Sequence, residues 1–566
     1  MSKLLQKQLK TLVFSLFLCP ALLLAACGSA AEAASEASGS AAAESLQALD
    51  TQDFFSTRDM DPSYDEAAAI PIQLNGSTAL CSSDAVSVNG GQITLLQEGV
   101  YLLSGTLEEG QILVNADDSA KVQIVLHGAD ITSASSAAIY CQAADKLFLT
   151  LAAGTENRLA NGGSFLQADD SNIDAVLFSK TDLTLNGEGS LTVDSPAGHG
   201  IVSKDELTVT GGSYQLTAAK QGLTGKDSVA IAGGNFTITA GTTGILSRNE
   251  EDDTLGNLYI ADGSFTIQAQ RDAIRASGEL QIDGGSYTLI TGGGSESAVM
   301  KSGDSMGRPG FDRSSPAENA SDGQENTASC KGIKAGGALT VNGGSFDLDT
   351  ADDGLHAGAD VTVTGGLFTI RTGDDAIHSD AALLIRSGSF TIPYCYEGLE
   401  GLTVIIEGGS LDITARDDGI NAAGGADGSG TAQGFGPQDP FAVSESCSVT
   451  INGGSITIVS DGDCIDSNGS LTVNGGTLKL TCNGNGNAAI DANGAFSNNG
   501  GDITTNDGSE SATGGQGSRG AMGGGKGGMG GSKPFSTEKS GGRMLPEAAP
   551  QRPEAAPPEL EAGATV

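Results

Sequence analysis

The sequence predicts an all-β protein, a right-handed parallel β-helix (a solenoid) with about 22 residues per coil. Two markers recur at this period. A turn such as "ADDG" stands directly before or beside a single aliphatic residue, and "GGSF" or a close variant keeps the same register. The composition agrees, because 84 glycines, no tryptophan and only 4% aromatic residues are typical of a solenoid rather than of a globular enzyme.

One period, "ALTVNGGSFDLDTADDGLHAG", contains three short strands, "LTV", "SFDL" and "GLHA", separated by "NGG" and "ADD" turns. Three strands and three turns make one coil, and each strand pairs with its counterpart in the next coil about 4.8 Å away. The right-handed winding follows the usual crossover preference. Equivalent positions then form interior lines: Phe346, Phe368 and Phe390 in one, and Val341, Val363, Ile385 and Ile406 in another.

The aliphatic marker sets the register of the coils. Six of its eleven steps are 21 or 22 residues long, and longer steps contain insertions, among them residues 302–329 and 424–440. We expect these two insertions to loop out without breaking the stack. The aliphatic positions are Ile201, Leu223, Ile245, Ile274, Val299, Ile333, Leu355, Ile377, Leu399, Ile420, Ile465 and Ile490.

Residues 1–27 resemble a bacterial lipoprotein signal. Lysines precede an apolar stretch that ends in "LAAC", the lipobox pattern in which Cys27 becomes the lipid-modified first residue of the mature chain. The alternative is an ordinary cleaved signal with an incidental cysteine. A transmembrane anchor is disfavoured, because no other apolar run approaches the ~20 residues that a spanning helix needs. We therefore predict a protein tethered by lipid to the extracellular face of a bacterial cell membrane.

The rest of the chain divides into three parts. Residues 28–49 are rich in Ala, Ser and Glu and read as a flexible linker. Residues 50–508 form the β-helix domain, in which residues 80–190 repeat less regularly and are interpreted as earlier coils of the same stack. Residues 509–566, rich in Gly, Met and Pro, are predicted to be a disordered tail.

The charge and the cysteines exclude several classes of partner and site. A formal net charge of -41 repels nucleic acid and anionic membranes and concentrates cations. Apart from Cys19 and Cys27, seven cysteines remain, an odd number without CxxC spacing. They indicate neither a zinc site nor a complete disulfide framework.

Acidic residues gather at one turn position in the later coils. The position two before the aliphatic marker holds one acid in the first six coils and an acid in each of the next five aligned turns. Stacked ionised carboxylates repel one another unless they are protonated, solvated or bridged by cations. We therefore expect calcium between successive coils. The predicted ligands are Asp353, Asp375, Glu397, Asp418 and Asp463, with the adjacent Asp352, Asp374 and Asp417.

Two other interpretations stay open. Asp-Asp-Gly is also a good turn sequence, in which the aspartates hydrogen-bond to their own backbone. A further acid-rich stretch, residues 59–65, is either a second cation site without an EF-hand loop or a solvated N-terminal cap.

The phrases "FFSTRDMDPSYDE", "GVYLLSGTL", "VQIVLHGADITS" and "LAAGTENRLANG", the "DDGLHA" turns and the Gly/Met-rich tail together cover most of the mature chain. In these the sequence resembles an extracellular bacterial family of carbohydrate-binding β-helix proteins, typified by a clostridial cellulose- and polygalacturonate-binding protein. The resemblance implies a calcium-containing β-helix that binds acidic plant polysaccharide. Glu397, in "CYEGLEG", departs from the family's Asp-Asp pattern.

We therefore expect a non-catalytic, monomeric binding protein in which calcium bridges the acidic turns to uronate carboxylates. The alternatives are a calcium-dependent pectate-type lyase and a surface adhesin. A lyase needs an unprotonated Arg or Lys as base, and the candidates, which are equally explained as counter-charges, are Lys331, Lys334, Arg371 and Arg416. His356 and His378 occupy equivalent positions and are expected to stack on the surface, either as sugar contacts, together with Arg371 and Arg416, or as an exposed ladder without function.

The lipid anchor is testable at one residue. Cys27→Ala should release the protein from membrane fractions or leave the signal uncleaved, because the thiol that carries the lipid is removed. Fractionation of cells and the mass of the mature chain measure both effects. Unchanged membrane association together with normal processing would contradict the anchor.

Overall fold

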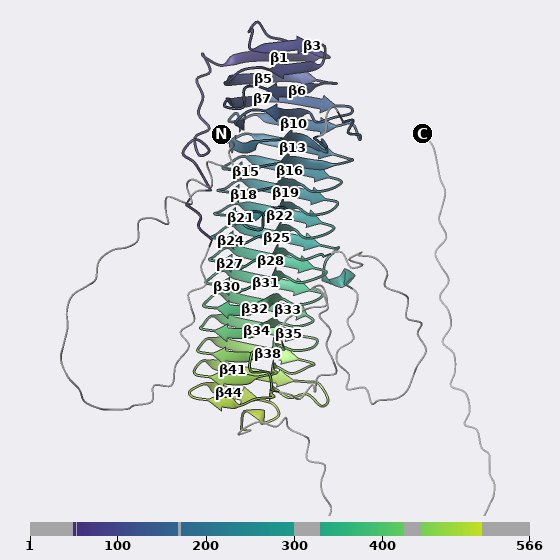
Figure 1. Ribbon diagram of the computed structural model, residues 1–566. Coiled ribbons are helices and arrows are strands. Elements are labelled where there is room, and N and C mark those ends of the chain that lie inside the picture. The colour runs from purple at the N-terminus through teal and green to yellow at the C-terminus, as the bar shows by residue number, and fades with distance from the viewer. Residues whose placement is uncertain (1–48, 53, 168–170, 299–328, 424–442, 512–566) are drawn as a thin grey trace, which may run out of the picture. The chain divides into compact units, whose positions relative to one another are not determined.

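The structure is a computed structural model that describes residues 49–52, 54–167, 171–298, 329–423 and 443–511 (Figure 1). Their regular secondary structure is almost entirely β, with 44 strands in one sheet and two short 3-10 helices, η1 (Ser295–Ser297) and η2 (Ser509–Ser511). Within the described residues only two pairings are antiparallel, and both join neighbouring strands at the N-terminal end. The predicted all-β, mainly parallel architecture is confirmed.

The first seven strands form this irregular N-terminal end. The long strand β7 pairs with two later strands: its first half pairs with β9 and its second half pairs with β10. The strands are β1 (Ile70–Gly76), β2 (Thr78–Leu80), β3 (Val86–Asn89), β4 (Gln92–Leu95), β5 (Gly99–Leu107), β6 (Gln111–Asn115) and β7 (Lys121–Ser133).

The later strands form three parallel ladders, and each repeat contributes one segment to each ladder. The first ladder contains the strands of the "GGSF" marker, most of which are six residues long. Its members are β10 (Glu156–Asn161), β13 (Ser190–Ser195), β16 (Ser213–Ala218), β19 (Asn235–Ala240), β22 (Ser264–Ala269), β25 (Ser286–Thr291), β28 (Ser345–Thr350), β31 (Leu367–Thr372), β33 (Ser389–Cys395), β35 (Ser410–Ala415), β38 (Ser455–Ser460), β41 (Thr477–Cys482) and β44 (Asp502–Thr505).

The second ladder contains the aliphatic marker, and it carries His199, His356 and His378. Its members are β8 (Ile139–Ala143), β11 (Ala175–Ser179), β14 (His199–Ser203), β17 (Leu223–Gly225), β20 (Ile245–Ser247), β23 (Ile274–Ala276), β26 (Ile333–Ala335), β29 (Leu355–Ala357), β32 (Ile377–Ile385), β34 (Leu399–Ile406), β36 (Ile420–Ala422), β39 (Ile465–Ser467) and β42 (Ile490–Ala492).

The third ladder completes each repeat. In two repeats it is continuous with the second ladder, because β32 and β34 run through both. Its other members are β9 (Lys146–Leu151), β12 (Asp182–Gly187), β15 (Glu206–Val209), β18 (Ser228–Ile231), β21 (Asn257–Ile260), β24 (Leu280–Ile282), β27 (Leu339–Val341), β30 (Val361–Val363), β37 (Ser448–Ile451), β40 (Ser470–Val473) and β43 (Phe496–Asn498).

The core consists of side chains stacked at equivalent positions. Phe346, Phe368 and Phe390 pack face to face with ring centroids 4.6 Å apart and are at most 2% exposed, which confirms the predicted aromatic line. The stack continues upstream through four more rings. The aliphatic line from Val341 to Ile406 is also fully buried. The additional rings are Tyr287, Phe265, Phe236 and Tyr214.

The second glycine of the "GGSF" marker is required by this packing. Gly366 has a φ of +118°, and a Cβ placed there would lie 2.9 Å from the ring of Phe368. A left-handed backbone and an aromatic ring at this distance leave room for glycine alone. The second glycine also recurs with a positive φ where an aliphatic residue replaces the ring, as Gly409 does before Leu411, so the left-handed backbone is the more general requirement.

One step of the predicted register is wrong. Ile274 pairs directly with Ile333, so the ladder does not pass through Val299, which lies outside the described residues. Three consecutive glycines, 292–294, have positive φ and turn the chain out of the first ladder after β25. Ile420 likewise pairs directly with Ile465, so the repeats on both sides of each insertion are in contact, as expected.

Several predicted segments lie outside the described residues. They are the signal with Cys27, the linker except Leu49, both insertions except Ser329, and the tail beyond Ser511. All of the described residues belong to one unit, Met1–Ser518. Among the described residues, no helix has the length and apolarity needed to cross a membrane.

The aromatic line makes a stability prediction. Phe368→Ala removes a ring that is 2% exposed and stacked on both sides, so the free energy of unfolding should fall by about 3–5 kcal/mol. Its neighbour Leu367 is 61% exposed, and Leu367→Ala should change the free energy by no more than about 0.5 kcal/mol. Urea unfolding of both variants measures the difference, and equal effects would contradict the packing argument.

Candidate functional site

Two columns of polar side chains run beside the second ladder. The turn column is the position two before each aliphatic marker, and the strand column is the position directly after it. The strand column follows the pairing register, so its members are neighbours in successive strands. The turn column contains Asp272, Lys331, Asp353, Asp375, Glu397, Asp418 and Asp463, and the strand column contains Arg275, Lys334, His356, His378, Glu400, Asn421, Asp466 and Asp491.

The turn aspartates have a structural role. One carboxylate oxygen of a turn-column aspartate accepts the backbone N–H of the equivalent residue in the next repeat: Lys331 donates to Asp272 at 2.9 Å, Asp463 donates to Asp418 at 2.6 Å, and Ala488 donates to Asp463 at 2.5 Å. The turn-forming interpretation and the ion-binding interpretation are therefore compatible, because the second oxygen of each carboxylate remains for another partner.

The upstream part of the columns is neutralised by the protein's own basic groups. Lys331 is 2% exposed, and its Nζ lies 2.5 Å from Asp353 and 2.9 Å from Asp352. Burial alone would raise the pKa of Asp353, but the charges of Lys331 and His356 hold it well below its usual range. These acids likewise raise the pKa of Lys331, although burial opposes the shift. Lys331 is therefore a buried counter-charge.

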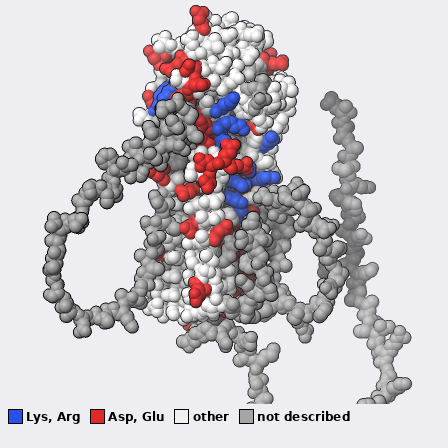
Figure 2. Space-filling view, in the orientation of Figure 1, with Lys and Arg blue, Asp and Glu red and all other residues white. Residues whose placement is uncertain are grey.

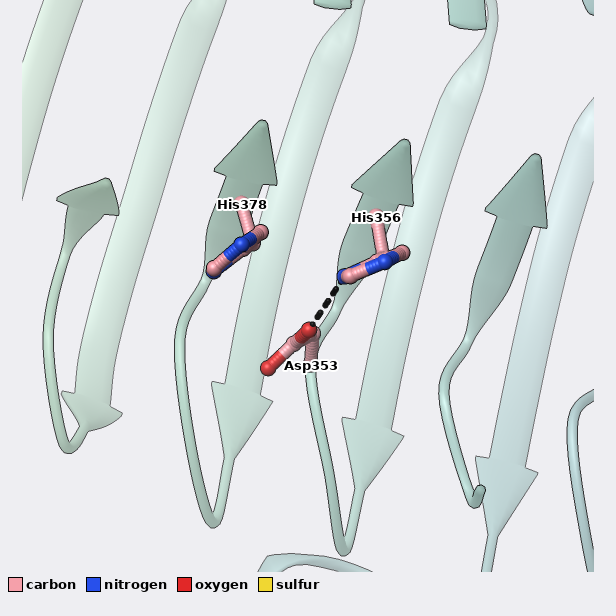
Figure 3. Close-up of side chains that lie close together, drawn as sticks. All are labelled: Asp353, His356 and His378. Carbon is pink, nitrogen blue, oxygen red and sulfur yellow. Dashed lines mark hydrogen bonds and ion pairs between the residues drawn. The ribbon is translucent and has the colours of Figure 1, made fainter. Parts of the chain in front are cut away.

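The two predicted histidines stack on each other but are not on the surface. Figure 3 shows the two rings side by side. They are parallel within 17°, and their centroids are 4.8 Å apart. The expectation of an exposed ladder is wrong, because His356 is 4% exposed and His378 is fully buried. Each Nδ1 lies 2.9 Å from the turn aspartate three residues earlier, so the rings fold back onto Asp353 and Asp375.

His378 has more carboxylate neighbours than His356. Its Nδ1 lies 2.9 Å from Asp375 and 2.7 Å from Glu400, and its Nε2 lies 3.1 Å from Asp380. Burial would lower the pKa of His378, but these three carboxylates raise it well above its usual range. The sequence analysis did not identify Glu400 and Asp380. Glu400 directly follows an aliphatic marker, so the repeat alignment could have placed it next to His378.

The downstream part of the columns has no basic partner. Within the described residues, none of its five carboxylates forms an ion pair with Lys, Arg or His. Burial, reinforced by repulsion between neighbouring acids, raises the pKa of Asp418 to about 9, of Glu397 to about 8, of Asp466 to about 7 and of Asp463 to about 6. The fifth is Asp491, whose pKa burial also raises.

Three of these carboxylates converge. Asp463, Asp466 and Asp491 each present an oxygen, and the three oxygens lie within 4.8 Å of one another. Asp466 and Asp491 belong to the strand column and were not predicted. A similar group upstream joins Asp352, Asp353 and Asp374, but Lys331 already contacts two of its members. Asp417 is half-buried beside Asp418, as its place in the Asp-Asp turn predicts.

The two predicted arginines lie on the side of the first ladder, around Tyr394. Arg371 is opposite Tyr394 in the register and lies 3.4 Å from Asp347. Arg416 donates to the Tyr394 hydroxyl at 3.3 Å, and its guanidinium lies 5.9 Å from the ring centroid. On the face shown in Figure 2, Lys and Arg gather over the N-terminal half of the ladders.

Within the acid-rich stretch 59–65, Asp59 is neither solvated nor open to a cation, whereas Asp61 and Asp65 are exposed. Asp59 is 2% exposed and lies 2.7 Å from Lys146. Its carboxylate also accepts from Thr184 at 2.5 Å, and its carbonyl accepts from Thr210 at 2.8 Å. These contacts fasten the N-terminal segment to the third ladder. The Asp59 charge is already paired with Lys146, so it is not free for a cation.

Comparison with known proteins places the chain in a family. Residues 89–376 and 373–526 match the family model described as "Carbohydrate-binding domain-containing protein". A protein of this description from Acetivibrio thermocellus is 35% identical over 137 residues, which are 24% of this chain and 48% of that protein. The chain thus spans about half the length of this relative. A solved structure of a polysaccharide lyase-like protein from C. thermocellum, a gadolinium derivative, is 33% identical and covers 40% of this chain and 92% of that one, with a TM-score of 0.39.

Removing a carboxylate charge should stabilise the folded chain in the downstream part of the turn column and destabilise it in the upstream part. The raised pKa of Asp418 means that the folded chain keeps a proton that the unfolded chain releases, so this carboxyl reduces stability as the pH rises from about 4 to about 9. In a chelator at about pH 8, Asp418→Asn should therefore raise the unfolding midpoint. The amide keeps the oxygen that accepts from Asp463.

Asp353→Asn is the matched comparison. The pKa of Asp353 is depressed, so its stabilising charge is present above its ordinary pKa and is lost as the pH falls. Removing it leaves Lys331 partly uncompensated, and the free energy of unfolding should fall by about 3–5 kcal/mol at neutral pH. Thermal or urea unfolding in chelator measures both effects. Midpoints of Asp418→Asn and Asp353→Asn that shift in the same direction would contradict this division of the column.

Proposed function

Because the chain belongs to the family of carbohydrate-binding domain-containing proteins, we propose that it is a non-catalytic protein that binds acidic polysaccharide of the polygalacturonate type through calcium. The observation that carries the proposal is the downstream group of carboxylates, Glu397, Asp418, Asp463, Asp466 and Asp491. They are partly buried, stacked, and without a basic partner among the described residues. Such a group requires protons or cations.

The donors suit calcium. Asp463, Asp466 and Asp491 offer three carboxylate oxygens within 4.8 Å of one another. Calcium prefers 6–8 oxygen ligands, which turn carbonyls and waters would complete. Glu397 and Asp418 with Asp417 would extend the acidic group by two repeats. Cation binding at Asp352 and Asp353 is disfavoured, because Lys331 already contacts both carboxylates. Asp374 and Asp375 stay in the proposal, since burial and neighbouring acids raise the pKa of Asp375 although His378 lowers it.

Calcium also explains how an acidic protein would bind an acidic glycan. A chain with a net charge of -41 repels a polyuronate at long range. A divalent cation held by protein carboxylates on one side keeps ligand positions for a uronate carboxylate on the other. In this proposal Arg371 and Arg416 would contact the glycan beside the ions, whereas the buried His356 and His378 would act through the carboxylates that they contact.

The runner-up is a pectate-type lyase. It requires an unprotonated Lys or Arg near the bound uronate. Lys331 does not suit this role, because Asp353 and Asp352 raise its pKa and it is 2% exposed. Arg371 contacts Asp347, which favours its counter-charge interpretation, whereas Arg416 donates to the neutral Tyr394 hydroxyl. No particular observation favours a surface adhesin.

Two further inferences belong to this proposal. We infer that the three ladders wind as the right-handed parallel β-helix expected from the sequence, which is supported by the pairing of each strand with its equivalent in the next repeat. We also propose that the protein is anchored by lipid at Cys27 on the extracellular face of the membrane, for which the "LAAC" pattern is the support.

Retention on insoluble polygalacturonate tests the proposal. The protein should be retained in calcium and released by a chelator. The double variant Asp463→Asn with Asp466→Asn should bind at least about tenfold more weakly, equivalent to about 1.4 kcal/mol. Asp412→Asn is the matched control, because Asp412 is an exposed acid of β35 outside both columns. Retention that survives both the chelator and the double variant would contradict calcium bridging, and absorbance from unsaturated uronate products would favour the lyase.

A further inference from the structure

The surroundings of His378 differ in chemistry from the purely acidic part of the columns. We propose that Asp375, His378 and Glu400 form a binding site for a transition-metal dication of the Zn²⁺ or Co²⁺ class. One imidazole nitrogen and two carboxylate oxygens from these residues lie within 4.8 Å of one another. The proposal does not depend on calcium or on a glycan.

The backbone register brings the three ligands together. His378 lies on β32, and Glu400 is its direct partner on β34. Asp375 lies in the turn three residues before His378, as Asp353 does before His356. His378 Nδ1 is 2.9 Å from Asp375 and 2.7 Å from Glu400. Three donor atoms from consecutive elements thus point to one place.

The single hydrogen of Nδ1 does not account for both carboxylates, and Asp375 and Glu400 also hydrogen-bond to each other. A single Nδ1–H forms one linear hydrogen bond, yet two carboxylate oxygens lie at hydrogen-bond distance from this nitrogen. The neighbouring histidine has no such excess, because Nδ1 of His356 has one carboxylate partner, Asp353, which Lys331 also neutralises. A dication among the three atoms would displace the Nδ1 proton to solvent, bind the nitrogen lone pair and both carboxylates, and balance their two negative charges.

The second nitrogen of His378, which would not bind the metal, already has a carboxylate partner. Its Nε2 lies 3.1 Å from Asp380, which is on the same strand. A histidine that binds a metal through one nitrogen almost always donates its other N–H to a carboxylate, carbonyl or water, which fixes the tautomer and the ring orientation. Asp380 would therefore be the outer partner of the site and not a ligand.

The nitrogen ligand selects the class of ion. Calcium and magnesium take oxygen ligands, whereas imidazole with carboxylates suits zinc and its neighbours in the first transition row. Zinc bonds of about 2.0–2.2 Å require the three ligand atoms to separate slightly from their present spacing. Water has a route to the site, because the Glu400 side chain is 15% exposed and that of Asp380 is 40% exposed. An open position for water or substrate therefore fits the site.

Co²⁺ is the probe, because its visible absorption reports coordination by nitrogen and oxygen. The full chain, prepared without a polyhistidine tag and stripped with chelator, is titrated with Co²⁺ in excess Ca²⁺. We expect about one bound Co²⁺ with a visible band, displaced by Zn²⁺. Asp380→Asn should weaken Co²⁺ binding by about 10–100-fold. Glu400→Gln and His378→Gln should weaken it further, because each removes a ligand.

His356→Gln is the matched control. It changes the stacked neighbour in the same column but keeps all three ligands, so Co²⁺ affinity should stay within about threefold. Far-ultraviolet circular dichroism confirms that each variant folds, and the partly exposed Glu400 and Asp380 keep the test decisive should His378→Gln unfold the chain. The proposal is overturned by absence of a Co²⁺ band, by its displacement by Ca²⁺, or by its loss in His356→Gln with retention in Glu400→Gln.

Discussion

Stacking of equivalent residues at the strand spacing is the constraint on which the rest of this structure depends. Every position of the repeat recurs about 4.8 Å further along the stack. At an apolar position this repetition is favourable, and the rings from Tyr214 to Phe390 pack face to face as a result. At an ionisable position the same repetition places like charges side by side, and Coulomb repulsion follows.

The chain meets this repulsion differently in two parts of the columns. Upstream, a basic residue replaces an acid or faces one, as Lys331 faces Asp353 and His356 faces the same carboxylate. Downstream, Asp418 and Asp463 have acidic neighbours instead. Both parts keep the backbone hydrogen bond of the turn aspartate, so the turn itself does not require the difference. The difference concerns the second oxygen of each carboxylate and its partner.

Much of this architecture was predictable because a period is visible in one sequence. The two markers predicted the strands, the interior lines and the turn column. Of the strand column, only His356 and His378 were recognised as equivalent positions, because its residues change from Arg275 to Asp491 and show no common type. The burial of the histidines was also missed, since it depends on rings that fold back onto Asp353 and Asp375. Val299 was misplaced because residues outside the period interrupt it.

Distance explains why the upstream basic groups do not serve the downstream acids. Five strand spacings separate Lys331 from Asp463, which is about 24 Å. This is roughly three times the Debye length of about 8 Å at physiological ionic strength. A charge at that separation contributes little, whereas Lys331 neutralises Asp353 at 2.5 Å. A basic residue therefore neutralises only the acids next to it in a stacked column. The downstream carboxylates, from Glu397 to Asp491, need protons or cations from solution. His378 lies between the two parts of the columns and contacts Asp375 of its own repeat, Glu400 of the next repeat and Asp380 of its own strand.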